Sequence, residues 1–285
     1  MPAEIGSSAL AWKSVLIHVD NHPSAVHRLE AAAALARQFD ALLIGLGGHM
    51  LEPVVVADAY GYSGIDPSAL EALREQAAAQ LAQAERAFQR AAEGLRTEWR
   101  VTESRPTQAL AHAARAADVI VAGGVAVKSS DHHFMADPAE LALISGRPVM
   151  IVPDQPRPLA AKRAVIAWKE SRESRTALAA ALPLLVGTEE VLVVEICGKD
   201  DAGDATNRVR DVASGLQRHG VKARGQALVG PDAEVAALLH QSAASVGADL
   251  IVAGCYGRSR VNEWLFGGAT LDLLAAPERY LLVNH

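Results

Sequence analysis

The feature that most constrains the fold of this chain is a repeated heptapeptide. Residues 117–123 read ADVIVAG, and residues 248–254 read ADLIVAG, at an offset of 131 residues. After its aspartate, each segment is short, apolar and rich in β-branched residues, which is typical of a strand buried on both faces of a parallel sheet. Two such segments predict that one folding unit occurs twice in the chain.

Two weaker matches follow the same order. Residues 15–20 (VLIHVD) match residues 164–169 (AVIAWK) at an offset of 149, and residues 149–152 (VMIV) match residues 280–283 (YLLV) at an offset of 131. The two offsets differ by 18, so the first copy carries that many additional residues between its early and late strands. Residues 50–66, which contain proline and glycine, read as a loop and are the predicted place for this insertion.

Strands alternate with helices in each copy. In the first copy a long helix with one apolar stripe begins at Asp66-Pro67. In the second copy the predicted strands are 164–168, 191–196, 223–229, 250–253 and 280–283, and the predicted helices include 174–185 and 233–245. This alternation predicts a doubly wound α/β sheet. We expect two domains, residues 1–155 and 160–285, joined by a proline-rich connector.

The composition excludes some classes of ligand and indicates where in the cell the protein is expected. The formal charge is −6, from 27 basic and 33 acidic residues, and no run of Lys or Arg offers a surface for nucleic acid or an anionic membrane. The sequence shows neither a signal peptide nor an apolar stretch near the roughly 20 residues of a membrane helix. Cys197 and Cys255 are too far apart for a metal motif or a disulfide framework. We therefore expect a cytoplasmic protein that binds a small molecule or another protein.

The segment after the fourth predicted strand of the second copy carries the candidate site. In an open parallel sheet, ligands bind outside the carboxyl ends of the strands, where the strand order reverses. Gly254 and Gly257 let the backbone turn tightly there, and Gly267 and Gly268 precede a predicted helix whose free N–H groups can hold a phosphate. The alternative is that these glycines only form turns, with the apolar residues 264–266 serving as packing residues.

The glycine spacing is similar to that of a known family. Gly254, Gly257 and Gly267 form a Gly-x2-Gly-x9-Gly pattern that resembles the nucleotide-binding signature of universal stress proteins. Residues 167–175 (AWKESRESR) resemble the first-strand segment of that family, and the repeat extends the resemblance over the whole chain as a tandem member. The resemblance implies two tandem Rossmann-like (adenine nucleotide alpha hydrolase-like) domains, each a five-stranded, mainly parallel sheet with helices on both faces. It also implies a cytoplasmic stress-response protein, with pairing through the last strands, either between the two halves or in a homodimer.

The same resemblance implies ATP or AMP, with Mg²⁺, as the ligand. The positions that would bind it are Gly254, Gly257, Arg258, Gly267, Gly268, Ala269, Thr270, Ala167 and Lys169. Two of them depart from the family pattern. Gly268 stands where the family has Ser or Thr, although its backbone N–H is retained. Lys169 stands where the family has an acidic residue near the adenine, and a lysine cannot accept a hydrogen bond.

The first copy departs further. Gly123 is retained, but Ala126 and Ala136 replace the next two glycines, and Asp137 places a negative charge where a phosphate would lie. Asp20 does remain after the first strand. We therefore expect any nucleotide site to lie in the second copy.

Three other interpretations stay open. Asp131, His132 and His133 offer metal ligands, but adjacent histidines rarely chelate one ion, and a solvated loop is favoured. Cys255 would be reactive if its thiol were activated by the helix terminus or by Arg258. ATP hydrolysis has only compositional candidates, namely Glu170, Glu173 and Asp272, and no Gly-x4-Gly-Lys-Ser/Thr loop supports it.

The remaining alternative is a protein-interaction module of the same fold that binds no nucleotide. The substitutions Asp137 and Lys169 favour it, and the intact spacing of Gly254, Gly257 and Gly267 disfavours it. On balance, the sequence predicts a protein that binds and signals rather than an enzyme, with unidentified protein partners.

Overall fold

The computed structural model describes residues 11–48, 55–57, 63–65, 67–124, 135–154, 158–255, 273–274 and 277–285. In chain order its strands are β1 (Ser14–Val19), β2 (Leu42–Gly48), β3 (Val55–Ala57), β4 (Ser63–Ile65), β5 (Thr97–Thr102), β6 (Val119–Gly123), β7 (Val149–Val152), β8 (Arg163–Ala167), β9 (Glu190–Cys197), β10 (Ala223–Val229), β11 (Leu250–Gly254) and β12 (Tyr280–Asn284). The helices are α1 (Ala25–Phe39), α2 (Pro67–Ala91), α3 (Pro106–Ala113), α4 (Pro138–Ile144), α5 (Arg172–Leu185), α6 (Ala202–Gln217) and α7 (Val235–Val246).

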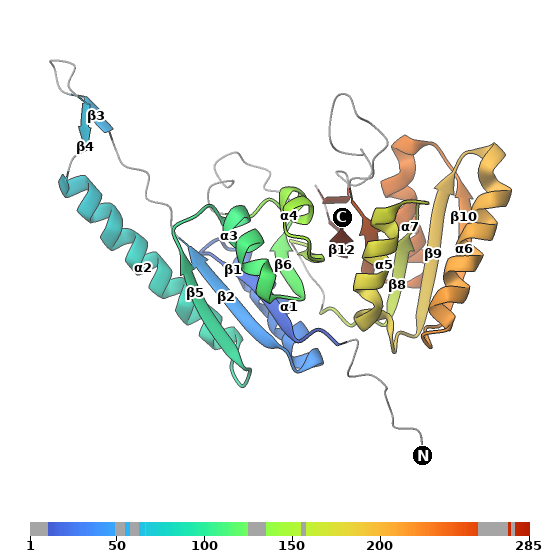
Figure 1. Cartoon of the computed structure of the whole chain (residues 1–285), viewed down its shortest axis with the longest axis horizontal. Helices are drawn as coiled ribbons and strands as arrows, with labels where there is room; N and C mark the ends of the chain where they lie inside the picture. Colours follow the sequence, from blue (N-terminus) through green and yellow to red (C-terminus); the bar gives the residue numbers. More distant parts are fainter. Residues whose placement is uncertain are drawn as a thin grey trace.

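A single sheet of ten strands runs through the molecule in the order β10-β9-β8-β11-β12-β7-β6-β1-β2-β5 (Figure 1). The first half contributes β5-β2-β1-β6-β7 and the second half β10-β9-β8-β11-β12, so both halves have the same strand order. Within each half the neighbouring strands are parallel. This is the α/β fold that the sequence predicts.

The halves join through their last strands. β7 and β12 are antiparallel, with Met150 opposite Leu282 and Ile151 opposite Leu281. In the repeat, Leu281 corresponds to Met150 and Leu282 to Ile151. The pairing therefore has the register of a two-fold relation, as in an isologous dimer interface.

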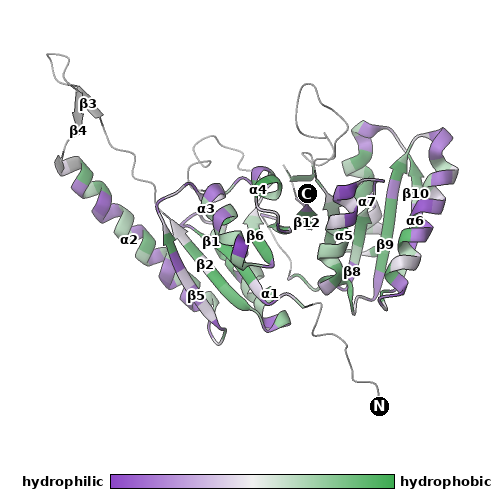
Figure 2. Cartoon of the chain, in the orientation of Figure 1, coloured by the Kyte–Doolittle hydropathy of each residue, from purple (hydrophilic) through white to green (hydrophobic). Residues whose placement is uncertain are grey.

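Helices cover both faces of the sheet. One core contains Leu29 of α1, Phe88 of α2, Ala181 of α5 and Val209 of α6. The other contains Leu110 of α3, Leu141 of α4 and Leu239 of α7, which are buried against the opposite face. The central strands are hydrophobic along their length, while the outer helices carry hydrophilic residues (Figure 2). No helix within the described ranges is long and apolar enough to cross a membrane.

The aspartate of the repeated heptapeptide has a structural role in both halves. Asp118 accepts hydrogen bonds of 3.0 Å from the backbone N–H and from the hydroxyl of Ser14, at the start of β1. Asp249 accepts hydrogen bonds from the backbone N–H groups of Ala160 (2.8 Å) and Ala161 (3.0 Å), just before β8. A partly exposed carboxylate that accepts such bonds fixes the chain that enters the first strand of each half. The aspartate of the most conspicuous repeat therefore serves the fold.

The insertion in the first half differs from its prediction. Residues 50–66 read as a loop, but β3 and β4 lie within this segment and form an antiparallel hairpin. The valines at 54–56 favour an extended strand, and the sequence interpretation gave more weight to the proline and glycines around them. The long helix predicted to follow is α2, which begins at Pro67.

Candidate functional site

The strand order places one switch point in each half. In the first half it lies between the carboxyl ends of β1 and β6, and in the second half between those of β8 and β11. The two are equivalent in register, because Val15 lies opposite Val119 and Ala164 lies opposite Leu250. An offset of 149 for the first strand and 131 for the fourth therefore holds in three dimensions, and residues of the two sites can be compared directly.

Of the predicted nucleotide-binding residues, the structure describes three. Ala167, Lys169 and Gly254 lie at the second switch point, at or just after the ends of β8 and β11. The other predicted residues lie outside the described residues, namely Gly257, Arg258, Gly267, Gly268, Ala269 and Thr270, as do Asp131, His132, His133 and Asp272. Their roles stay predictions. Among the described residues no group of three His, Cys, Asp or Glu side chains is placed to hold a metal ion.

Gly254 is required by the packing of α5. A Cβ atom at this position would lie 2.5 Å from the carbonyl carbon of Glu173 and 2.5 Å from the backbone nitrogen of Ser174. Both of these atoms are backbone, so they cannot move aside as a flexible side chain would. The helix start and the end of β11 are therefore in contact through their backbones, and the structural role of this glycine is present whether or not a ligand binds.

The start of α5 is held by two serines. Ser171 is the N-cap, and its hydroxyl accepts a hydrogen bond of 3.2 Å from the N–H of Ser174. The N–H of Lys169 donates to the hydroxyl of Ser174 at 3.2 Å, so the backbone after β8 is fixed to the helix. The Lys169 side chain itself is exposed.

Cys255 is not a reactive thiol. It follows Gly254 and is fully buried. Burial raises its pKa to about 12, and the nearby charge of Glu173 acts in the same direction. Since the thiolate is the nucleophilic form, the structure favours an inert, buried Cys255 over the reactive alternative. The sequence placed Cys255 in a glycine-rich loop, but only the tertiary packing shows that no solvent reaches it.

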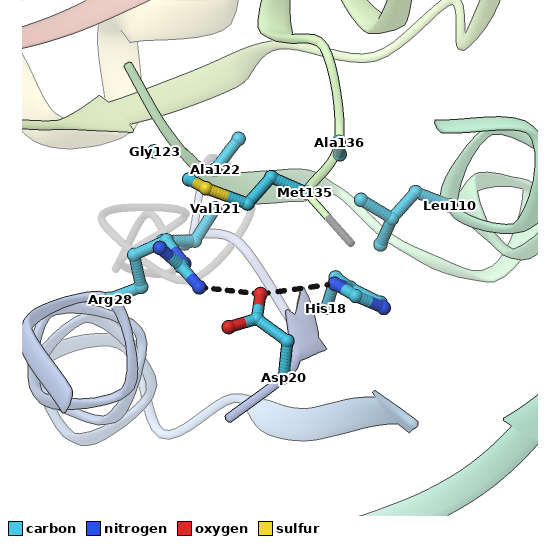
Figure 3. A pocket seen from close by; sticks show the side chains of 9 residues that line it. All are labelled: His18, Asp20, Arg28, Leu110, Val121, Ala122, Gly123, Met135 and Ala136. Carbon is cyan, nitrogen blue, oxygen red and sulfur yellow. Dashed lines mark hydrogen bonds and ion pairs between the residues drawn. The ribbon is translucent and has the colours of Figure 1, made fainter. Parts of the chain in front are cut away.

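The first switch point is filled by charged side chains of its own half. We call His18, Asp20, Ser24 and Arg28 the Asp20 cluster. Arg28 donates from Nη2 to Asp20 Oδ2 at 2.6 Å and from Nη1 to the Ser24 hydroxyl at 2.7 Å, and His18 Nδ1 lies 3.4 Å from the same carboxylate oxygen. Figure 3 shows Asp20 between Arg28 and His18. The side chains of Arg28 and Asp20 are only 5% and 9% exposed.

The Asp20 carboxylate is ionised in this setting. Burial alone favours its neutral form, but the hydrogen bond from His18 and the positive charge of Arg28 outweigh burial and hold the pKa of Asp20 below its ordinary value. The backbone N–H of His22 adds a further hydrogen bond of 2.8 Å. The one acidic residue that the first half retains after its first strand is thus satisfied internally.

The cavity between this cluster and β6 is small. It is lined also by Leu110, Met135 and Ala136 and has a volume of about 10 Å³, which is room for about one water molecule. Asp137 is the N-cap of α4, and its carboxylate accepts hydrogen bonds from the N–H groups of Ala139 (2.8 Å) and Glu140 (3.3 Å). This cavity is too small for a nucleotide, whereas a larger hollow of about 430 Å³ lies on the other side of Asp20, between the start of α1 and α2.

The equivalent residues of the second half are small and uncharged. At the offset of 149, His18 corresponds to Ala167 and Arg28 to Ala177, and no ion pair like that of the Asp20 cluster joins the described residues there. Both alanines can be read from the sequence once the two halves are aligned. The sequence did not show their importance, because only the fold brings Arg28 and Asp20 together.

The structure resembles solved universal stress proteins. A universal stress protein from Archaeoglobus fulgidus DSM 4304 matches with a TM-score of 0.70 at 16% identity, with 95% of each chain covered. A functionally unknown protein from Pseudomonas aeruginosa PAO1 matches with a TM-score of 0.59 at 18% identity, covering 98% of this chain and 94% of that one. No protein-family model and no curated protein matches the sequence. The chain thus has the Rossmann-like fold of these structures, and the fold that the resemblance implies is confirmed.

Proposed function

We propose that this chain is a tandem universal stress protein that binds an adenine nucleotide at its second switch point and acts by binding rather than by turnover. The observation that carries the proposal is the contrast between the two switch points. Arg28 and His18 fill the first, and alanines stand at both positions in the second. The first predicted domain would then have a structural role, and the second would bind the ligand.

The described residues of the second half fit such a ligand. Ala167 and Ala177 remove bulk and charge from the site, and the exposed Lys169 offers a cation at its rim. The predicted glycines beyond Gly254 would supply backbone N–H groups to the phosphates, and Mg²⁺ would accompany a triphosphate. Family membership, a cytoplasmic location and a homodimer belong to the same proposal.

The test is calorimetric titration of the nucleotide-stripped protein with ATP and Mg²⁺. We expect about one site per chain, abolished by Gly257→Asp because a carboxylate would repel the phosphates. The matched control is Ala126→Asp, the same new charge at the equivalent position of the first half, which should leave binding unchanged. If the wild-type protein released no heat with ATP or AMP, the proposal would fail and the interaction module would take its place.

A further inference from the structure

A hollow lies between α1 and α2, the two helices that cover one face of the first half. Its volume is about 430 Å³, and small-molecule sites usually measure about 300–1,000 Å³. It shares Asp20 with the small cavity of the first switch point, but it extends from there along the two helices as far as Glu30 and Ala91. We call it the α1–α2 hollow, and all the residues that line it belong to the first half.

The α1–α2 hollow is braced at both ends by hydrogen bonds between the helices. Near the start of α1, the side-chain amide of Asn21 donates to the backbone carbonyl of Gln80 at 3.0 Å. Near the end of α1, Arg37 donates from Nη2 to the backbone carbonyl of Ala91 at 3.0 Å. Because β1, β2 and β5 are parallel, α1 and α2 run in the same direction, so these two bonds lie on either side of the hollow. Contacts of the chain itself therefore hold the walls in place, which lowers the ordering cost of binding a ligand.

The middle of the α1–α2 hollow is apolar. Leu29 lies at its base and is only 3% exposed, and Ala25, Ala87 and Ala91 line its sides. Val26 also lines it and is 49% exposed, which is high for a valine on a helix that packs against the sheet. The hollow thus presents apolar surface that a ligand with an apolar body would remove from water.

The two acidic residues that line the hollow are engaged within their own helix or loop. Asp20 is held by Arg28 at 2.6 Å, inside the Asp20 cluster. Glu30 Oε2 lies 3.8 Å from Nδ1 of His27, on the same helix. Neither carboxylate is therefore directed to a cation from outside the chain.

Arg90 is in the opposite situation. Its side chain lines the hollow and is exposed, and it forms no hydrogen bond or ion pair with the residues that the structure describes. Gln83 lines the hollow from the same helix and likewise has no side-chain partner among those residues. The two residues are two helical turns apart, which is about 10 Å along α2. A free guanidinium thus stands at one end of the apolar surface, and a free amide stands at the other.

We propose that the α1–α2 hollow binds an amphipathic organic anion, a carboxylate with an aliphatic or aromatic body of about eight carbon atoms, which spans the roughly 10 Å between Arg90 and Gln83. The carboxylate pairs with the guanidinium of Arg90, whose fork can donate two hydrogen bonds to it. The body lies against Val26, Leu29 and Ala87. This site is separate from the proposed nucleotide site, and either can exist without the other.

The experiment is a ligand-observed NMR titration of the full chain with sodium octanoate. Octylamine, with the same chain and the opposite charge, and propionate, with the same carboxylate and a short chain, are the comparison probes. Arg90→Gln removes the guanidinium, and Arg86→Gln is the matched control, because Arg86 is exposed on the same helix but does not line the hollow. Ala87→Trp fills the hollow with an indole ring, and Gln83→Trp, at an exposed position, replaces it if Ala87→Trp does not fold.

We expect octanoate to bind with a Kd of about 1 mM, the affinity that partial burial of its chain and one exposed ion pair can supply. Arg90→Gln should weaken this binding about three- to tenfold, and Arg86→Gln should leave it unchanged. The tryptophan variant should abolish it. Octylamine and propionate should each bind at least about tenfold more weakly than octanoate, because one lacks the charge that Arg90 pairs with and the other lacks the apolar body.

Four results would overturn the inference. If octanoate did not bind to the wild-type protein, the site would not exist, and if octylamine bound as tightly, the hollow would not select an anion. Equal weakening in Arg90→Gln and Arg86→Gln would mean that only the general charge of α2 matters. Binding that survived the tryptophan variant but was lost in Gly257→Asp would place octanoate at the second switch point instead. None of these results bears on ATP binding, which is titrated separately.

Discussion

Replacement of Arg28 by Met tests the buried ion pair of the first half. The substitution keeps much of the aliphatic volume but removes the guanidinium that lies 2.6 Å from Asp20. Breaking a buried ion pair by removing one partner costs about 3–5 kcal/mol, because the other charge stays buried without compensation. Here His18 and the N–H of His22 still contact the carboxylate, so we expect a loss near the lower end, about 3 kcal/mol.

Urea unfolding followed by tryptophan fluorescence measures this loss. The double variant Asp20→Asn, Arg28→Met should lose less than the sum of the single variants, since it leaves no unpaired charge. Arg96→Met is the control, because Arg96 pairs with Asp40 at the surface, where its side chain is 64% exposed, and its removal should cost less than about 1 kcal/mol. An Arg28→Met variant as stable as Arg96→Met, or strictly additive single effects, would refute the reasoning.

Three further predictions follow from the same contacts. Because folding lowers the pKa of Asp20, its contribution to stability is complete above about pH 4 and is lost as the pH falls below that value. The stability of Asp20→Asn should therefore depend less on pH in this range than that of the wild type. An unchanged pH dependence would contradict the prediction. Gly254→Ala should lower the free energy of unfolding in urea by about 1–3 kcal/mol, because the new methyl group meets the backbone of α5. The control Gly123→Ala places its methyl group 3.4 Å from side-chain atoms only and should cost less. Equal losses in the two variants would argue against the backbone contact at Gly254. Cys255, with its pKa near 12, should react with an alkylating reagent at pH 8 only after unfolding, which mass spectrometry of the labelled peptide would detect.

The protein's repeated pattern made the fold predictable from sequence. Short apolar segments alternate with segments of helical periodicity, and both recur at fixed offsets. These local signals located the strands of the second half to within one or two residues. The hairpin β3–β4 was missed because its few residues carry a weak strand signal beside strong loop residues. The pairing of β7 with β12 followed from the family resemblance rather than from any residue pattern.

The candidate site was less predictable. The sequence identified the segment from Gly254 onward and the retained Asp20, and it named Glu173 by composition only. The structure adds that Asp20 is paired with Arg28 and that Glu173 is buried at the start of α5. Whether a carboxylate is available depends on which side chains the fold places around it.

The sequence by itself determined that this protein is a duplicated α/β unit with an insertion in its first copy and a glycine-rich segment after the fourth strand of its second. Those properties follow from periodicity, turn residues and spacing, which are local along the chain. Only the tertiary structure decided that the two halves form one sheet, that Arg28 pairs with Asp20 at the first switch point, and that Glu173 is buried at the second. Burial and electrostatic pairing depend on residues far apart in sequence, so they become visible only once the chain has folded.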